Sequence, residues 1–127
     1  MIKFNRLLKV IFHFTNITLI LFYLYPGSIL GYILYNNFTK QPQITRDFSN
    51  ISTNHFYAFL FLSIIGILAY INGKKIYFVI KYLFLLSIVL ELFHLIISTR
   101  AFQLADLLGN ILGVLVAFII YKVLRYN

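Results

Sequence analysis

The chain has 127 residues, of which 61% are hydrophobic and 11% are charged, with a mean hydropathy of +0.90 and a net charge of +8. A soluble domain of this length would carry about 25% charged residues, so the composition favours an integral membrane protein. The absence of cysteine excludes disulfides, thiolate metal sites and cysteine nucleophiles. Because the basic residues stand at the ends of apolar runs, where they anchor helices, we expect no nucleic-acid partner.

Four apolar runs are long enough to cross a membrane, since a helix needs about 20 residues to span the hydrocarbon core. The first run ends at the helix-breaking pair Pro26-Gly27 and lacks a small-residue cleavage site, so we expect a retained span, not a signal peptide. The sequence therefore predicts an all-α integral membrane protein, a single domain over 1–127 that forms a compact antiparallel bundle of four transmembrane helices. The predicted spans are about 7–25, 55–71, 76–97 and 106–124.

Between the first two predicted spans lie a short apolar piece, 28–35, and a polar loop, 36–54. The apolar piece is too short to cross, and it can lie at the interface, extend the first helix, or dip into the membrane and return. The sequence does not decide the conformation of 28–54. By contrast, the basic turn 72–75 is tight, which predicts that the second and third spans are antiparallel neighbours.

Lysine and arginine are unevenly distributed over the two sides of these spans. If the N-terminus is inside, eight of the eleven lie on the inner side and three on the outer side. Because Lys and Arg are enriched on the cytoplasmic side, we expect both termini to be cytoplasmic and the polar loop to be external. The inner residues are Lys3, Arg6, Lys9, Lys74, Lys75, Lys81, Lys122 and Arg125, and the outer residues are Lys40, Arg46 and Arg100.

The stretch 91–113 holds two of the three acidic residues of the chain, Glu91 and Asp106, on either side of Arg100. Ionisable groups within or beside a membrane span are costly unless they are paired, so they mark a candidate functional site. Under the predicted topology these groups and His55 share the outer side. One face of the third helix would present Ser87, Glu91, His94 and Ser98, and one face of the fourth would present Asp106, Asn110, Gly113 and Ala117.

Gly109, Gly113 and Ala117 form a series of small residues at four-residue spacing on the fourth span. Small residues let helix backbones approach closely, so we expect this series to dock the fourth span against the third. That contact would bring the two polar helix faces together. A third helix that ends at Ile97 would hold Glu91 about 9 Å below its outer end.

Two interpretations of Arg100 stay open. It can pair with both acids in a Glu91–Arg100–Asp106 triad that stabilises the hairpin between the last two spans. Alternatively it binds an anionic headgroup or phosphate, with Glu91, His94 or Asp106 as candidate catalytic acid, base or positioning group. Both can hold together, and the sequence does not decide whether any reaction is catalysed. The candidate ligand-binding residues are His55, Glu91, His94, Arg100, Asp106 and Asn110.

The pattern does not predict a metal site. Glu91-x-x-His94 resembles half of a carboxylate-bridged di-iron motif, which needs further glutamates and a second such pair. The chain has only three acids, so we expect no metal and no cofactor. A serine triad also lacks support, because no strained elbow or oxyanion motif accompanies Ser98 and His94.

The polar residues of the last two spans follow the spacing E-x2-H-x5-R-x5-D-x3-N-x2-G, from Glu91 to Gly113. This spacing resembles the signature of VanZ-like membrane proteins, an E..Q.....R.....D...N..G pattern over the last two helices. Phe102 and the segment 55–59, which begins with a histidine, also fit, and the resemblance covers about 54 to 120. The departures are His94 where the family more often has glutamine, Asn54 where it often has an acid–lysine pair, and Ala117 where it often has a second glycine.

The resemblance implies a four-helix protein of the bacterial cytoplasmic (inner) membrane. Some VanZ-like members are linked to low-level teicoplanin resistance and many to cell-envelope loci, without an agreed biochemical activity. We therefore expect an outward-facing Glu/Arg/Asp site that binds an anionic lipid or lipid-linked glycan headgroup, or else a non-catalytic subunit that stabilises or regulates an envelope enzyme or transporter. The expected partners are membrane lipids, with an envelope protein or a homo-oligomer as further options.

Overall fold

The computed structural model describes residues 2–126, which fold into five α-helices and, within that range, no β-strand beyond an isolated bridge between Phe48 and Ile51. Four of the helices are long and apolar enough to cross a membrane, which confirms the predicted all-helical fold with four candidate spans and suggests a multi-pass membrane protein. The helices are α1 (Ile2–Leu24), α2 (Ile29–Tyr35), α3 (Thr53–Tyr70), α4 (Ile76–Phe93) and α5 (Leu104–Tyr126).

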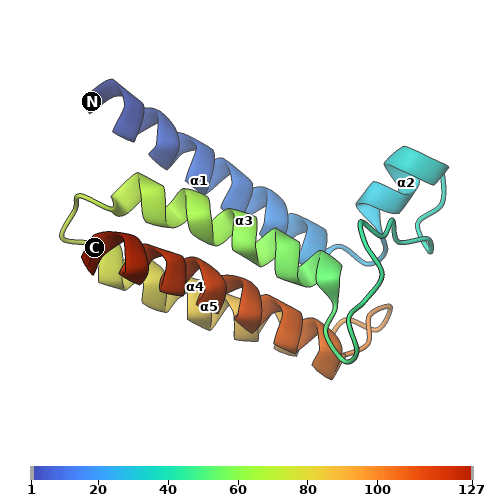
Figure 1. The fold of residues 1–127 in the computed structure, drawn as a ribbon. Coiled ribbons are helices and arrows are strands. Elements are labelled where there is room, and N and C mark those ends of the chain that lie inside the picture. The colour runs from blue at the N-terminus through green and yellow to red at the C-terminus, as the bar shows by residue number, and fades with distance from the viewer. Residues whose placement is uncertain (1, 127) are drawn as a thin grey trace.

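The four long helices lie side by side, and successive ones run in opposite directions (Figure 1). α3 lies between α1 and α5 and shares its longest contact with α5, while α4 packs on both α3 and α5. The beginning of α1 and the end of α5 therefore lie at the same end of the bundle. At the opposite end α1 and α4 finish and α3 and α5 begin, and we call this end the polar end.

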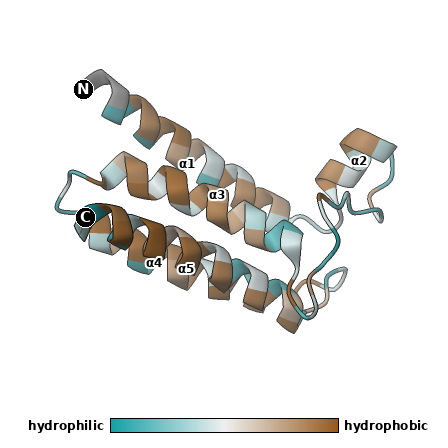
Figure 2. Ribbon diagram, viewed as in Figure 1, coloured by the Kyte–Doolittle hydropathy of each residue, from teal (hydrophilic) through white to brown (hydrophobic). Residues whose placement is uncertain are grey.

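Hydrophobic side chains cover the outside of the bundle as well as its core. Figure 2 shows brown, hydrophobic ribbon along most of the four long helices and teal, hydrophilic ribbon in the loops. Phe14, Phe78 and Leu124 are 71–76% exposed. Exposed apolar area is unfavourable in water by roughly 25 cal/mol per Å² but not in lipid, so this surface agrees with a membrane-spanning protein.

The segment after Pro26-Gly27 forms a short separate helix, α2, so it does not extend α1. The Ser28 hydroxyl begins this helix by accepting a hydrogen bond from the Gly31 amide at 2.9 Å. Asn36 ends it in the left-handed conformation, with φ at 52°. α2 projects from the polar end beside the end of α1, and the polar loop returns from it to α3 (Figure 1).

α4 ends at Phe93, four residues before the predicted end at Ile97. The chain then turns through hydrogen bonds between residues three apart, such as that from the His94 backbone amide to the Glu91 carbonyl, at 3.1 Å. The boundary predicted at Ile97 was wrong, because it rested on hydropathy, which stays high through the apolar turn. In the structure the helix has ended where the His94 imidazole comes to lie 3.1 Å from the Tyr23 carbonyl on α1. Glu91 is therefore two residues from the helix end and level with the start of the turn.

The glycines of α5 face α3. A Cβ atom at Gly113 would lie 2.5 Å from the carbonyl oxygen of Phe56 and 2.7 Å from the amide nitrogen of Leu60, and Gly109 similarly approaches the backbone at the start of α3. The sequence predicted that these small residues dock the fourth span, α5, against the third span, which is α4. That prediction was wrong, because the nearest atoms belong to α3, the second span. A small-residue series identifies a close helix contact but does not say which helix is the partner. Ala117, the next member, is buried in a cluster shared by α3, α4 and α5.

Gly113→Ala is expected to reduce the free energy of unfolding by about 1–3 kcal/mol, because the added methyl group meets backbone atoms of α3 that cannot rotate away. Thermal unfolding of the purified protein in detergent, followed by circular dichroism, measures the effect. Gly73→Ala is the matched control, since a Cβ atom there meets no atom closer than 3.4 Å. Equal stability of the two variants would contradict the close contact of α5 with α3.

Candidate functional site

Buried polar side chains gather at the polar end, where α1, α3, α4 and α5 each contribute. Glu91 and Asn110 are 0% exposed, and the side chains of His55 and Asp106 are each 16% exposed. Tyr23, in the last turn of α1, lies among them and is also buried. Polar groups in an apolar bundle are costly unless they are hydrogen-bonded, so the bonds among these side chains define the site.

The Tyr23 hydroxyl links α3 and α5. It lies 2.6 Å from Asn110 Oδ1 and 2.8 Å from His55 Nδ1. His55 Nδ1 is also 3.2 Å from Asn110 Oδ1, and Asn110 Nδ2 donates to the Ser87 carbonyl on α4 at 3.1 Å. The last turn of α1 is therefore joined to three other helices through one connected set of hydrogen bonds.

These partners assign the proton positions. The Ser87 carbonyl only accepts, so Asn110 directs Nδ2 toward it and Oδ1 toward Tyr23. Tyr23 must then donate to Asn110, because otherwise two acceptor oxygens would face each other at 2.6 Å. His55 in turn donates from Nδ1. A neutral His55 therefore directs the lone pair of Nε2 at Asp106 Oδ2, 3.6 Å away.

Two groups contact the same carboxylate oxygen of Glu91, Oε1. Oε1 accepts from the backbone N–H of Gln103 at 2.9 Å and lies 3.3 Å from His94 Nδ1. His94 Nε2 lies 3.1 Å from the Tyr23 carbonyl, so both ring nitrogens of His94 face acceptors. The hydrogen bond to Glu91 raises the pKa of His94 above its ordinary value, which favours the imidazolium. The second oxygen of Glu91, Oε2, is buried and has no hydrogen-bond partner within residues 2–126.

Arg100 bonds the end of α1 and forms no ion pair with an acid of the described chain. Its Nε donates to the Tyr25 carbonyl at 3.3 Å, and its Nη2 donates to the Phe22 carbonyl at 3.2 Å and to the Gly27 carbonyl. The last carbonyls of a helix lack partners within the helix and attract cations. The Glu91–Arg100–Asp106 triad, one of the two interpretations of Arg100, is therefore not formed, because carbonyls in the last turn of α1 and just after it accept from the guanidinium. Burial lowers the pKa of Arg100, although arginine stays protonated in proteins.

A cavity of about 620 Å³ lies between α1, α2 and α3 at the polar end. Its walls are mostly apolar, with side chains such as Leu19, Leu30 and Phe61, and this volume is within the usual range of about 300–1,000 Å³ for ligand pockets. A second cavity, of about 680 Å³, lies at the opposite end and is lined by none of the predicted ligand-binding residues. The polar residues that line the first cavity include Tyr23, His55, His94 and Arg100.

The structure places most of the predicted ligand-binding residues in one network. Arg100 adjoins this network through the backbone of α1, and Ser98 is exposed in the turn after α4. Tyr23 was missed by the sequence analysis, because a tyrosine near a helix end is ordinary at a membrane interface and carries no motif. The predicted residues in the network are His55, Glu91, His94, Asp106 and Asn110.

Comparisons of the chain with protein-family models, with curated proteins and with solved structures find no match. The resemblance to VanZ-like proteins therefore stays a prediction from the spacing of one motif. Any functional proposal for this chain has to rest on the geometry of its own polar end.

Tyr23→Phe is expected to reduce the free energy of unfolding by about 1–3 kcal/mol, because it removes the hydroxyl that satisfies His55 and Asn110 in a buried place. Thermal unfolding in detergent checks the prediction. Tyr25→Phe is the control, since the Tyr25 ring is 39% exposed and its hydroxyl bonds no described residue. If Tyr23→Phe is as stable as Tyr25→Phe, the hydroxyl does not hold the helices together.

Proposed function

We propose that the protein binds the anionic headgroup of a lipid or lipid-linked glycan in the cavity at the polar end. The observation that carries this proposal is the mixed lining of the cavity, which is mostly apolar but also includes His55, His94 and Arg100. An amphiphile fits such a lining, because its chain contacts the apolar walls while its headgroup meets the donors and charges. Catalysis is not part of the proposal.

Arg100 is the group best suited to meet a phosphate or other anion. Its Nε and Nη2 donate to carbonyls in the last turn of α1 and just after it, which hold the guanidinium in place, and no described residue accepts from Nη1. A guanidinium held in this way loses little conformational freedom when it binds an anion. His94 also lines the cavity, and its Nδ1 lies 3.3 Å from Glu91 Oε1.

The distribution of basic residues supports an outward-facing site. The polar end carries only Lys40, Arg46 and Arg100, while the other eight basic residues lie toward the opposite end. By the positive-inside rule this favours a cytoplasmic location for both termini and access to the cavity from the outer leaflet. The motif spacing shared with VanZ-like proteins supports a place in the bacterial cytoplasmic membrane. The ligand would then be a lipid of the cell envelope.

The lipid proposal is tested by native mass spectrometry of the protein released from mild detergent. Wild type is expected to carry a defined anionic lipid or glycolipid, and Arg100→Ala is expected to lose it because the positive charge is gone. Arg100→Lys, which keeps the charge but not the planar fork, should retain less than wild type. The matched control is Arg46→Ala, which removes an exposed arginine of the polar loop.

Circular dichroism establishes that each variant is folded. The proposal is wrong if folded Arg100→Ala retains the same lipids as wild type. It is also wrong if wild type brings only a protein partner, since the protein would then act as a non-catalytic subunit of an envelope enzyme or transporter.

The proposed orientation makes a separate prediction about the chain termini. A fluorescent protein that matures only in the cytoplasm, fused after residue 127, is expected to fluoresce in intact bacteria. A periplasmic reporter enzyme inserted in the polar loop 36–54 should be active, because that loop would lie outside. A dark C-terminal fusion with an inactive loop insertion would reverse the orientation and place the cavity on the cytoplasmic side.

A further inference from the structure

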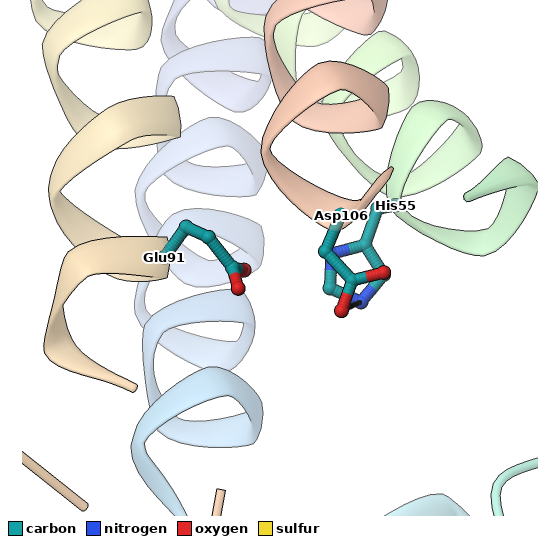
Figure 3. Close-up of side chains that lie close together, drawn as sticks. All are labelled: His55, Glu91 and Asp106. Atoms are coloured by element: carbon teal, nitrogen blue, oxygen red, sulfur yellow. Dashed lines mark ion pairs between the residues drawn. The ribbon is translucent and has the colours of Figure 1, made fainter. Parts of the chain in front are cut away.

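His55, Glu91 and Asp106 come from three different helices and lie close together at the polar end. One potential metal-ligand atom from each lies within 4.8 Å of the other two. Figure 3 shows the Glu91 carboxylate directed from α4 toward the other two side chains. We propose that these residues bind one divalent first-row transition ion, with Zn²⁺ as the best match. This proposal goes beyond lipid binding and does not depend on it.

The main argument is that acceptor atoms face one another where Glu91 is buried and His55 and Asp106 are largely buried. In a neutral His55, the hydrogen bonds of Nδ1 leave the lone pair of Nε2 directed at Asp106 Oδ2, at 3.6 Å. Glu91 is 0% exposed, and its Oε2 has no hydrogen-bond partner among the described residues. Acceptors and carboxylates in such surroundings are strongly unfavourable without a positive charge between them. A divalent cation would supply positive charge between His55, Asp106 and the unbonded Oε2 of Glu91, whose other oxygen already faces His94.

The groups around the three residues resemble the outer shell of a metal site. Metal-binding histidines almost always donate their second ring N–H to an oxygen, which fixes the tautomer and the ring plane. His55 does so through Nδ1 to the Tyr23 hydroxyl, which itself donates to Asn110. Glu91 is held in the same way by the Gln103 amide, at 2.9 Å from Oε1. The His55 and Glu91 side chains are therefore oriented before any ion binds.

The donor set and spacing indicate the kind of ion. Zn²⁺ binds imidazole nitrogen at about 2.0–2.1 Å and carboxylate oxygen at about 2.0–2.2 Å, so tetrahedral ligand atoms lie roughly 3.4 Å apart. The His55–Asp106 pair, at 3.6 Å, already approaches this spacing. A ligand atom of Glu91 lies within 4.8 Å of both, so it needs to approach by at most about 1.4 Å. An imidazole nitrogen disfavours Ca²⁺ and Mg²⁺, which prefer all-oxygen sites.

This site differs from the metal motif considered in the sequence. Glu91-x-x-His94 placed both candidate ligands on one helix, whereas in the structure His94 directs its nitrogens at Glu91 Oε1 and at the Tyr23 carbonyl. The potential ligands that join Glu91 in the structure are His55 on α3 and Asp106 on α5. Only the packing of three helices brings these ligands together, so sequence spacing could not show them.

The test measures Zn²⁺ bound to the full-length, untagged protein in mild detergent, by elemental analysis and by titration against a chelator. Wild type is expected to bind one Zn²⁺ per chain. His55→Gln, Glu91→Gln and Asp106→Asn should each weaken binding by at least about 10-fold, as loss of metal-site groups typically does. His13→Gln and Asp47→Asn are matched controls outside the site, because His13 bonds Tyr70 and Asp47 bonds the Thr53 amide.

Asp106→Asn is the decisive variant, since it is nearly isosteric and Asp106 is partly exposed, whereas Glu91→Gln alters a fully buried group. Loss of Zn²⁺ in folded Asp106→Asn and His55→Gln, with binding intact in the two controls, supports the site. Wild type that binds no Zn²⁺ overturns the proposal, and His55 and Asp106 then form a simple ion pair. Binding that is equal in all variants also overturns it. Lipid retention is measured separately on Arg100, so either proposal can fail alone.

Discussion

The Tyr23 hydroxyl is the contact on which the polar end depends. It bonds His55 on α3 and Asn110 on α5, while the backbone carbonyl of the same residue lies 3.1 Å from His94 after α4. The rings of Tyr23 and His94 also stack, with centroids 5.8 Å apart and planes 14° apart. Since an unpaired polar group inside an apolar bundle is costly, these bonds restrict the rotation of four helices about their axes. The last turn of α1 thus sets the positions of groups that come from the rest of the chain.

The second constraint is the close approach of α5 to α3. Gly109 and Gly113 leave room for the backbone of α3, so the start of α5 comes near the start of α3. That approach places Asp106 beside His55, with 3.6 Å between Oδ2 and Nε2. Packing and electrostatics are therefore linked here, because two absent methyl groups decide how near an acid lies to a histidine.

The ionisable side chains of the polar end differ in whether they line the cavity. Arg100, His94 and His55 line it, whereas Glu91 and Asp106, which contact the two histidines, do not. Arg100 forms an ion pair with neither acid, because carbonyls in the last turn of α1 and just after it occupy two of its nitrogens. One end of a small bundle can in this way offer positive charge to an anionic headgroup and acceptor atoms to a cation. Both proposed sites follow from this arrangement.

The sequence alone determined the four spans, the basic turn between the second and third, and most of the side chains that meet at the polar end. Hydropathy and helical spacing are local properties, so Glu91 and Asn110 could be recognised as inward-facing groups on their own helices. The tertiary structure decided which helix each face meets. Arg100 bonds a carbonyl 75 residues away, Gly113 packs on α3 and not on α4, and Tyr23 joins the site without any motif. These contacts depend on the rotation and end points of neighbouring helices, which are set by packing across the bundle and leave no periodic pattern in the chain.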